Sequence, residues 1–213
     1  MNKRKFLTAS IQLAGAASLS MASAGRALAQ ANKGYEIISP ALNTRDASKV
    51  EVLEYFWFGC PHCFAFEPHI NSWAANRPAY IDFVREAPPL NPSWEPHSRA
   101  FYAAELMGVT DKFFEPMFNG IHAERRALRS PDQIASFAGE LDIDKKMFRK
   151  TMDSFAVNTR IKQAMHMARA SKVSAVPTVI INGKYRTGGS LAGSHKGMVD
   201  VIEHLTAQEQ KLI

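Results

Sequence analysis

The chain has 213 residues, of which 46% are hydrophobic and 22% are charged, values that are ordinary for a globular protein. Its formal net charge of +6 would suit a protein that binds nucleic acid or a membrane surface, but residues 1–29 hold four basic side chains and no acidic one, which leaves 22 basic and 20 acidic side chains in the remainder. The charge distribution therefore argues against a nucleic-acid partner, and the length allows one domain, with or without an insertion.

The first 29 residues have the pattern of a secretory signal peptide. A basic start at residues 3–5 leads into an Ala-rich stretch over residues 6–24, and the Ala-Leu-Ala at residues 27–29 fits cleavage before Gln30. A membrane anchor needs about 20 strongly apolar residues, and this stretch is interrupted by Ser, Gln and Gly. The start also resembles a twin-arginine signal with its first Arg replaced, so the export route stays open. We expect export, with cleavage after about Ala29.

A strand followed by a helix is predicted around the only two cysteines. Residues 30–49 are polar and turn-rich, which indicates a lead-in and not a part of the core. Residues 50–58 are rich in β-branched and aromatic side chains and predict a central strand. After one glycine, Cys60 can be the N-cap and Pro61 the first residue of a helix, where the missing N–H costs nothing, and this helix is predicted to end near residue 75.

Strand signals continue at residues 80–84 and then vanish until about residue 170, which indicates a helical block inside the chain. Its helices are predicted at residues 97–107, from the cap Asp111 to Phe118, from the capping box at Ser130 to about Gly139, from the cap Asp144 to about Phe155, and from the cap Asn158 to about Ala170.

Strands return after the helical block. Residues 178–181 and 184–186 flank Asn182-Gly183, which is the strongest short-range signal for a β-hairpin because both turn residues need a positive φ. A final helix is predicted over residues 194–212. The predicted order is therefore β-α-β, helical block, β-β-α.

Cys60 and Cys63 are too close in sequence to stabilise the fold much by bonding, because disulfide stabilisation grows with loop length. A zinc site needs four ligands, and there is neither a second cysteine pair nor a His pair with suitable spacing. Haem attachment needs His directly after the second cysteine, where Phe64 stands. The pair therefore predicts a dithiol/disulfide redox centre that uses neither a metal nor another cofactor.

The predicted helix assigns different roles to the two sulfurs. Unpaired N–H groups and the positive end of the helix dipole favour the Cys60 thiolate, so we expect a lowered pKa there. A stabilised thiolate is a good leaving group and makes the disulfide an oxidant. His62 lies between the sulfurs and can add donors or positive charge, and Cys63, one turn into the helix, is expected to be the buried resolving thiol.

The motif Phe58-Gly59-Cys60-Pro61-His62-Cys63-Phe64 resembles that of the DsbA family of bacterial periplasmic thiol-disulfide oxidoreductases. Further similar segments follow in the same order, at residues 52–56, 128–130, 176–178 and 181–185. The resemblance covers nearly all of the chain after residue 29. Trp57 and Gly59 need not match the commonest family residues, so the polarity near Cys60 can differ.

The resemblance implies an α/β thioredoxin fold, in which a central mixed sheet is flanked by helices and interrupted by an inserted helical domain. The expected division is a signal peptide at 1–29, a thioredoxin-like domain at 30–91 and 171–213, and the helical domain at 92–170. A very acidic first cysteine and a strongly oxidising disulfide are known family properties, which the resemblance implies here.

The resemblance also implies roles for two positions outside the motif. Val176-Pro177 resembles the family's cis-proline loop, which lies against the active site and pairs with extended substrate backbone, although cis is the minority isomer of X-Pro bonds. Glu54 lies in an apolar strand, so it is either at an exposed edge or buried with a task. The family has a buried acid there, thought to assist proton transfer to or from the second cysteine.

The resulting hypothesis is a periplasmic enzyme that donates the Cys60–Cys63 disulfide to reduced, unfolded secreted polypeptides through a mixed disulfide. A DsbB-type quinone-linked oxidase of the inner membrane would then reoxidise the pair. Two alternatives stay open. A reductase or isomerase often carries an N-terminal dimerisation domain, for which residues 30–49 are too short, so we expect a monomer; a non-catalytic chaperone would carry the cysteines incidentally.

Overall fold

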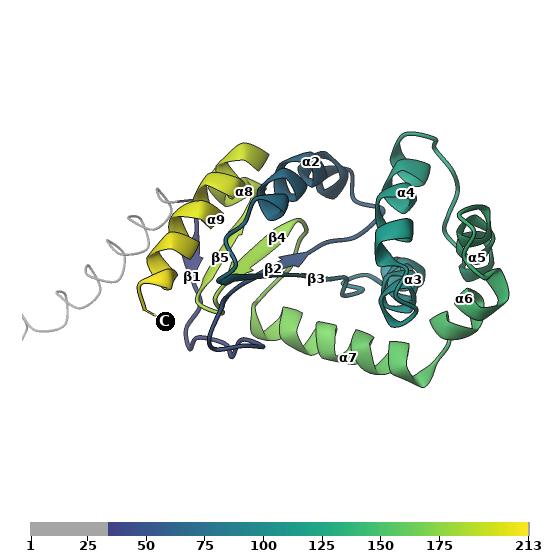
Figure 1. The fold of residues 1–213 in the computed structure, drawn as a ribbon, viewed down its shortest axis with the longest axis horizontal. Coiled ribbons are helices and arrows are strands. Elements are labelled where there is room, and N and C mark those ends of the chain that lie inside the picture. The colour runs from purple at the N-terminus through teal and green to yellow at the C-terminus, as the bar shows by residue number, and fades with distance from the viewer. Residues whose placement is uncertain (1–33, 213) are drawn as a thin grey trace, which may run out of the picture.

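The computed structural model describes residues 34–212, and the predicted signal peptide lies outside them (Figure 1). The elements in chain order are β1 (Glu36–Ile37), β2 (Val50–Tyr55), α2 (Pro61–Ala75), β3 (Ile81–Glu86), the 3-10 helix η1 (Pro92–Trp94), α3 (Glu95–Leu106), α4 (Thr110–His122), α5 (Pro131–Glu140), α6 (Lys145–Met152), α7 (Phe155–Ala170), β4 (Thr178–Ile181), β5 (Tyr185–Gly188), α8 (Gly189–Ala192) and α9 (His195–Gln210). None of the helices in this part of the chain has the length and apolar character needed to cross a bilayer.

The five strands form one mixed sheet in the order β1-β5-β4-β2-β3. β2 is parallel to β3 and antiparallel to β4, and all six β2 residues are buried. Val52 faces α2 and α9, whereas Leu53 and Tyr55 face the other side, where the end of α7 covers the sheet (Figure 1). Because successive side chains of β2 point to opposite faces of the sheet, they contribute to two hydrophobic cores. The predicted mixed sheet flanked by helices is confirmed.

The helices α3 to α7 follow β3 and precede β4, and α3 to α6 lie beyond one end of the sheet in Figure 1. Their core includes side chains from the loop that leaves β2, because the rings of Phe56 and Phe58 pack among Phe101, Phe114 and Phe118. The segment that leads to Cys60 is thus held by the helical block as well as by the sheet.

The hairpin predicted at Asn182-Gly183 is confirmed. Both residues have positive φ, at 49° and 65°, and they join β4 to β5. A side chain at Gly183 would also meet the backbone oxygen of Leu42 at 2.2 Å, so glycine is required there for space as well as for conformation.

Several predicted boundaries are wrong. The lead-in holds the short strand β1, which pairs with β5. β3 continues to Glu86 and α4 continues to His122. In the helical block, α6 ends at Met152 and α7 begins earlier than predicted, because the Ser154 side chain, and not that of Asn158, caps the helix by accepting the N–H of Val157.

Candidate redox-active site

Cys60 lies at the junction predicted for it, between the loop after β2 and the first turn of α2. It is the N-cap of α2, with φ −86° and ψ 116°, and Pro61 follows in the first turn. The Cys60 sulfur accepts the backbone N–H of Cys63 at 3.4 Å, and the Cys60 N–H donates to the carbonyl of Trp57 at 2.9 Å. The two cysteines are not bonded, so the structure presents the dithiol form.

The two sulfurs differ in acidity. A hydrogen bond from the Cys63 thiol is the largest cause that lowers the pKa of Cys60, from its ordinary 9.0 to about 6, and it outweighs the opposing effect of burial. Burial raises the pKa of Cys63 far above its ordinary value, since its side chain is fully enclosed. Near neutral pH the pair therefore holds a Cys60 thiolate beside a protonated Cys63.

His62 is exposed on the first turn of α2. Its backbone N–H and the charge of its side chain are further causes that lower the pKa of Cys60. The imidazole thus has the electrostatic effect expected from its place in the motif.

The loop before β4 reaches the Cys60 sulfur. The Val176–Pro177 peptide bond is cis, as the resemblance implies, and the Cys60 sulfur lies 3.5 Å from the carbonyl oxygen of Val176, to which the protonated thiol can donate. Pro177 is buried and Val176 is half-buried. Two segments that are 116 residues apart in sequence therefore form one site.

Glu54 is fully buried in β2, so the exposed-edge alternative is wrong. Burial raises its pKa, and the Arg85 guanidinium, whose Nε donates to Glu54 Oε2 at 2.8 Å, opposes this. Its other oxygen, Oε1, has no hydrogen-bond partner among residues 34–212. The Glu54 charge in turn raises the pKa of Cys63, which couples the carboxyl to the buried thiol.

Glu67 and Arg85 were not predicted to belong to the site. Glu67, on α2, accepts from the same Arg85 at 3.3 Å and from Asn71 at 3.0 Å. Burial and the charge of Glu54 raise the pKa of Glu67 to about 8. A signal for Glu67 exists in the sequence, because position 67 lies four residues after Cys63 and so on the same inward face of the helix. Arg85 lies between Val84 and Glu86 at the end of a strand and gives no such signal.

His122, at the end of α4, was missed as well. Its Nε2 donates to the carbonyl of Phe58 at 2.7 Å, and its ring stacks on Phe64 with centroids 4.9 Å apart. The helical block therefore contacts the chain on both sides of the cysteine motif.

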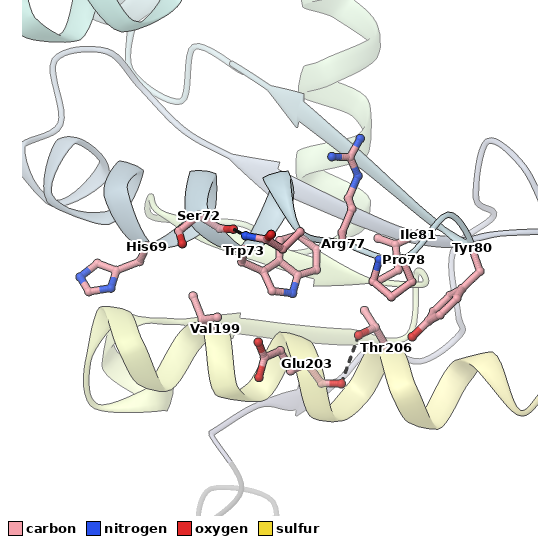
Figure 2. Close-up of a pocket in the computed structure, with 11 residues that line it drawn as sticks. His69, Ser72, Trp73, Arg77, Pro78, Tyr80, Ile81, Val199, Glu203 and Thr206 are labelled. Carbon is pink, nitrogen blue, oxygen red and sulfur yellow. Dashed lines mark hydrogen bonds between the residues drawn. The ribbon is translucent and has the colours of Figure 1, made fainter.

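A groove of about 400 Å³ between α2 and α9 is separate from the cysteines (Figure 2). It is lined by His69, Ser72, Trp73, Asn76, Arg77, Pro78, Tyr80, Ile81, Val199, Glu203 and Thr206. In the close-up Trp73 lies toward its centre and Tyr80 at one end, and the Thr206 hydroxyl donates to the backbone of Glu203. The groove follows the C-terminal half of α2, whereas the two cysteines lie at the N-terminal end of that helix.

Comparisons with known proteins agree with this geometry. The model of the DSBA-like thioredoxin domain family matches residues 51–196. The thiol:disulfide interchange protein DsbA of Burkholderia cepacia is 34% identical over 207 residues, which cover 97% of this chain and 98% of the relative. The DsbA of Pseudomonas aeruginosa PAO1 is 36% identical over 199 residues, which cover 91% of this chain and 94% of the relative. The crystal structure of Pseudomonas aeruginosa DsbA superposes with a TM-score of 0.80 at 35% identity, over 85% of this chain and 94% of the other.

Proposed function

Because the chain belongs to the DsbA-like thioredoxin domain family, whose activity is thiol:disulfide oxidoreduction, we propose that it donates the Cys60–Cys63 disulfide to newly exported polypeptides. The acidity of Cys60 is the observation that supports this direction of disulfide transfer, from the protein to its substrate. A pKa of about 6 stabilises the reduced pair as a thiolate, and whatever stabilises the reduced form makes the disulfide more oxidising.

The reaction begins when a substrate thiolate attacks the sulfur of Cys60. The Cys60–Cys63 bond breaks, Cys63 leaves with the electron pair and takes up a proton, and a mixed disulfide joins the substrate to Cys60. A second substrate thiolate then attacks the substrate sulfur, and Cys60 leaves as the thiolate. The substrate loses two electrons and gains a disulfide, while the pair becomes a dithiol.

Three further groups would serve these steps. The Val176–Pro177 loop, beside the Cys60 sulfur, would pair with the extended backbone of the substrate. The charge of His62 would favour the departing Cys60 thiolate. Glu54 would assist the movement of the proton to or from Cys63, which its buried position and its effect on the pKa of that thiol support.

The proposed partners are reduced, unfolded polypeptides in the periplasm and a DsbB-type quinone-linked membrane oxidase that removes the two electrons from the reduced pair. We further propose a monomer in which residues 30–91 and 171–213 form the thioredoxin-like domain and residues 92–170 form the inserted helical domain. Support for this division is that α3 to α7 all fall between β3 and β4.

The test is oxidation of a reduced, unfolded model protein by the oxidised enzyme, followed as loss of free thiols. Cys60→Ala should abolish activity, because the attacked sulfur is gone. Cys63→Ala should also fail to oxidise the reduced substrate, because the donated disulfide cannot form. With an oxidised substrate, Cys60 of this variant should still attack and then accumulate the mixed disulfide, because Cys63 is missing to resolve it in that direction. Full oxidase activity in Cys60→Ala would contradict the proposal, and efficient refolding of a scrambled-disulfide substrate by a dimeric parent would favour an isomerase instead.

A further inference from the structure

Trp57 is the residue of the loop after β2 whose backbone serves both cysteines. Its carbonyl accepts the N–H of Cys60 at 2.9 Å, which closes the turn that places Cys60 at the start of α2. Its own N–H lowers the pKa of Cys63, against the much larger effect of burial. A shift of the Trp57 backbone would therefore alter both the turn that places Cys60 and the surroundings of the Cys63 sulfur.

The indole of Trp57 stacks with planar groups from the start of the helical block. The ring of Trp94, in η1, lies 4.5 Å from it at an interplanar angle of 5°, and the ring of His97, in α3, lies 5.7 Å from it at 28°. His97 is itself fixed, because it is buried and its Nε2 donates to the carbonyl of Leu128 at 2.6 Å. The stack thus ties the loop to two elements outside the sheet.

Gly59 completes this arrangement. The indole covers its α-carbon so closely that a Cβ there would lie 2.3 Å from Cζ2 of Trp57. A contact of that kind forces a ring to move, since Cβ atoms do not approach ring carbons so closely. The Trp57 indole therefore occupies the space that a side chain at position 59 would need, so tryptophan at 57 requires glycine at 59. Neither residue need be the commonest one of the family at its position.

We propose that Trp57 is a positioning residue through which Trp94 and His97 hold the backbone at the cysteine pair, so that the start of the helical block sets how oxidising the pair is. The inference rests on the proposed function. Stacking restricts the indole to one rotamer and keeps residues 57–60 in the geometry that stabilises the Cys60 thiolate. Removal of a stacking partner should loosen this turn and make the reduced form less favourable.

Trp94→Ala tests the proposal, because Trp94 is outside the cysteine motif and lies in a short, partly exposed helix. The glutathione equilibrium should shift about three- to tenfold toward the protein disulfide, and the pKa of Cys60, followed by thiolate absorbance, should rise correspondingly, since a tenfold change equals one pKa unit. Trp94→Phe should restore most of the parent value. The control is Phe155→Ala, which removes an aromatic ring that is 85% exposed in the same helical block and should change neither quantity.

A double-mutant cycle separates positioning from a general loss of structure. In a Trp57→Ala background, Trp94→Ala should cause no further shift, because the indole through which it acts is absent; an equal shift in both backgrounds would overturn the proposal. Gly59→Ala should shift the equilibrium in the same direction when Trp57 is present and much less in Trp57→Ala, where the space is open. Circular dichroism and thermal unfolding check that each variant is folded.

The outcomes distinguish this inference from the function on which it rests. A parent protein that does not oxidise a reduced substrate would refute the proposed function. A parent that oxidises the substrate, together with a folded Trp94→Ala variant at the parent equilibrium, would refute only the role of Trp57.

Discussion

The Cys60 thiolate predicts how the stability of the reduced protein depends on pH. Folding lowers the pKa of this thiol from 9.0 to about 6. A group whose pKa is depressed in the folded state stabilises that state fully above its unfolded pKa, and the stabilisation is lost as the pH falls through the folded pKa. The full difference is worth about 4 kcal/mol, of which about 1.4 kcal/mol is present at pH 7 and almost none at pH 5.

The oxidised protein is the matched reference for this prediction, because it has the same fold but no thiolate. Urea unfolding of both forms at pH 5 and pH 7 gives the difference between their free energies of unfolding, in which the titration of shared groups such as Glu67 largely cancels. That difference should move in favour of the reduced form by about 1.4 kcal/mol as the pH rises from 5 to 7. Reduced Cys60→Ala should lack the gain. Equal pH dependence in the reduced and oxidised forms would refute a stabilised Cys60 thiolate.

Two further predictions concern groups near the pair. His62→Ala should raise the pKa of Cys60 and shift the glutathione equilibrium about three- to tenfold toward the disulfide, because it removes a positive charge beside the sulfur; an unchanged equilibrium would contradict that role. Arg85→Met should lower the free energy of unfolding by about 3 to 5 kcal/mol in urea titrations, because it leaves two buried carboxyl groups without their cation. Glu67→Gln should cost far less, since Arg85 then still pairs with Glu54, and equal losses in the two variants would count against this network.

The parts of the fold that the sequence predicted well depend on local signals. The Asn182-Gly183 hairpin and the proline-led start of α2 each follow from a few adjacent residues. The errors arose where the deciding contact is distant or where two local signals compete. β1 has only two residues and exists because Glu36 and Ile37 pair with β5, some 150 residues later in the chain. At the start of α7, the predicted cap was Asn158, but Ser154, a residue type equally suited to capping, stands four residues earlier and is the cap.

The site divides in the same way. The cysteine motif is continuous in sequence, so its chemistry and its low-pKa sulfur could be inferred before any fold was known. Arg85 could not be found, because it meets Glu54 across 31 residues and Glu67 across 18. The stack of Trp57 on Trp94 could not be predicted from the sequence either, since no spacing or pattern around either tryptophan indicates contact with the other. Residues joined only by tertiary packing leave no spacing to recognise.

The distance in sequence between Cys60 and Val176 has a consequence for the order in which the molecule is completed. The cysteine motif and α2 precede the loop before β4 by more than a hundred residues, and β2 also waits for β4 to fill its free edge. Such non-local pairing forms late, because a long chain must first be closed into a loop. During synthesis from the N-terminus the reactive thiols therefore emerge long before the backbone that lies against them. A nascent chain that ends before residue 176 carries both thiols but lacks the Val176–Pro177 loop that lies against Cys60.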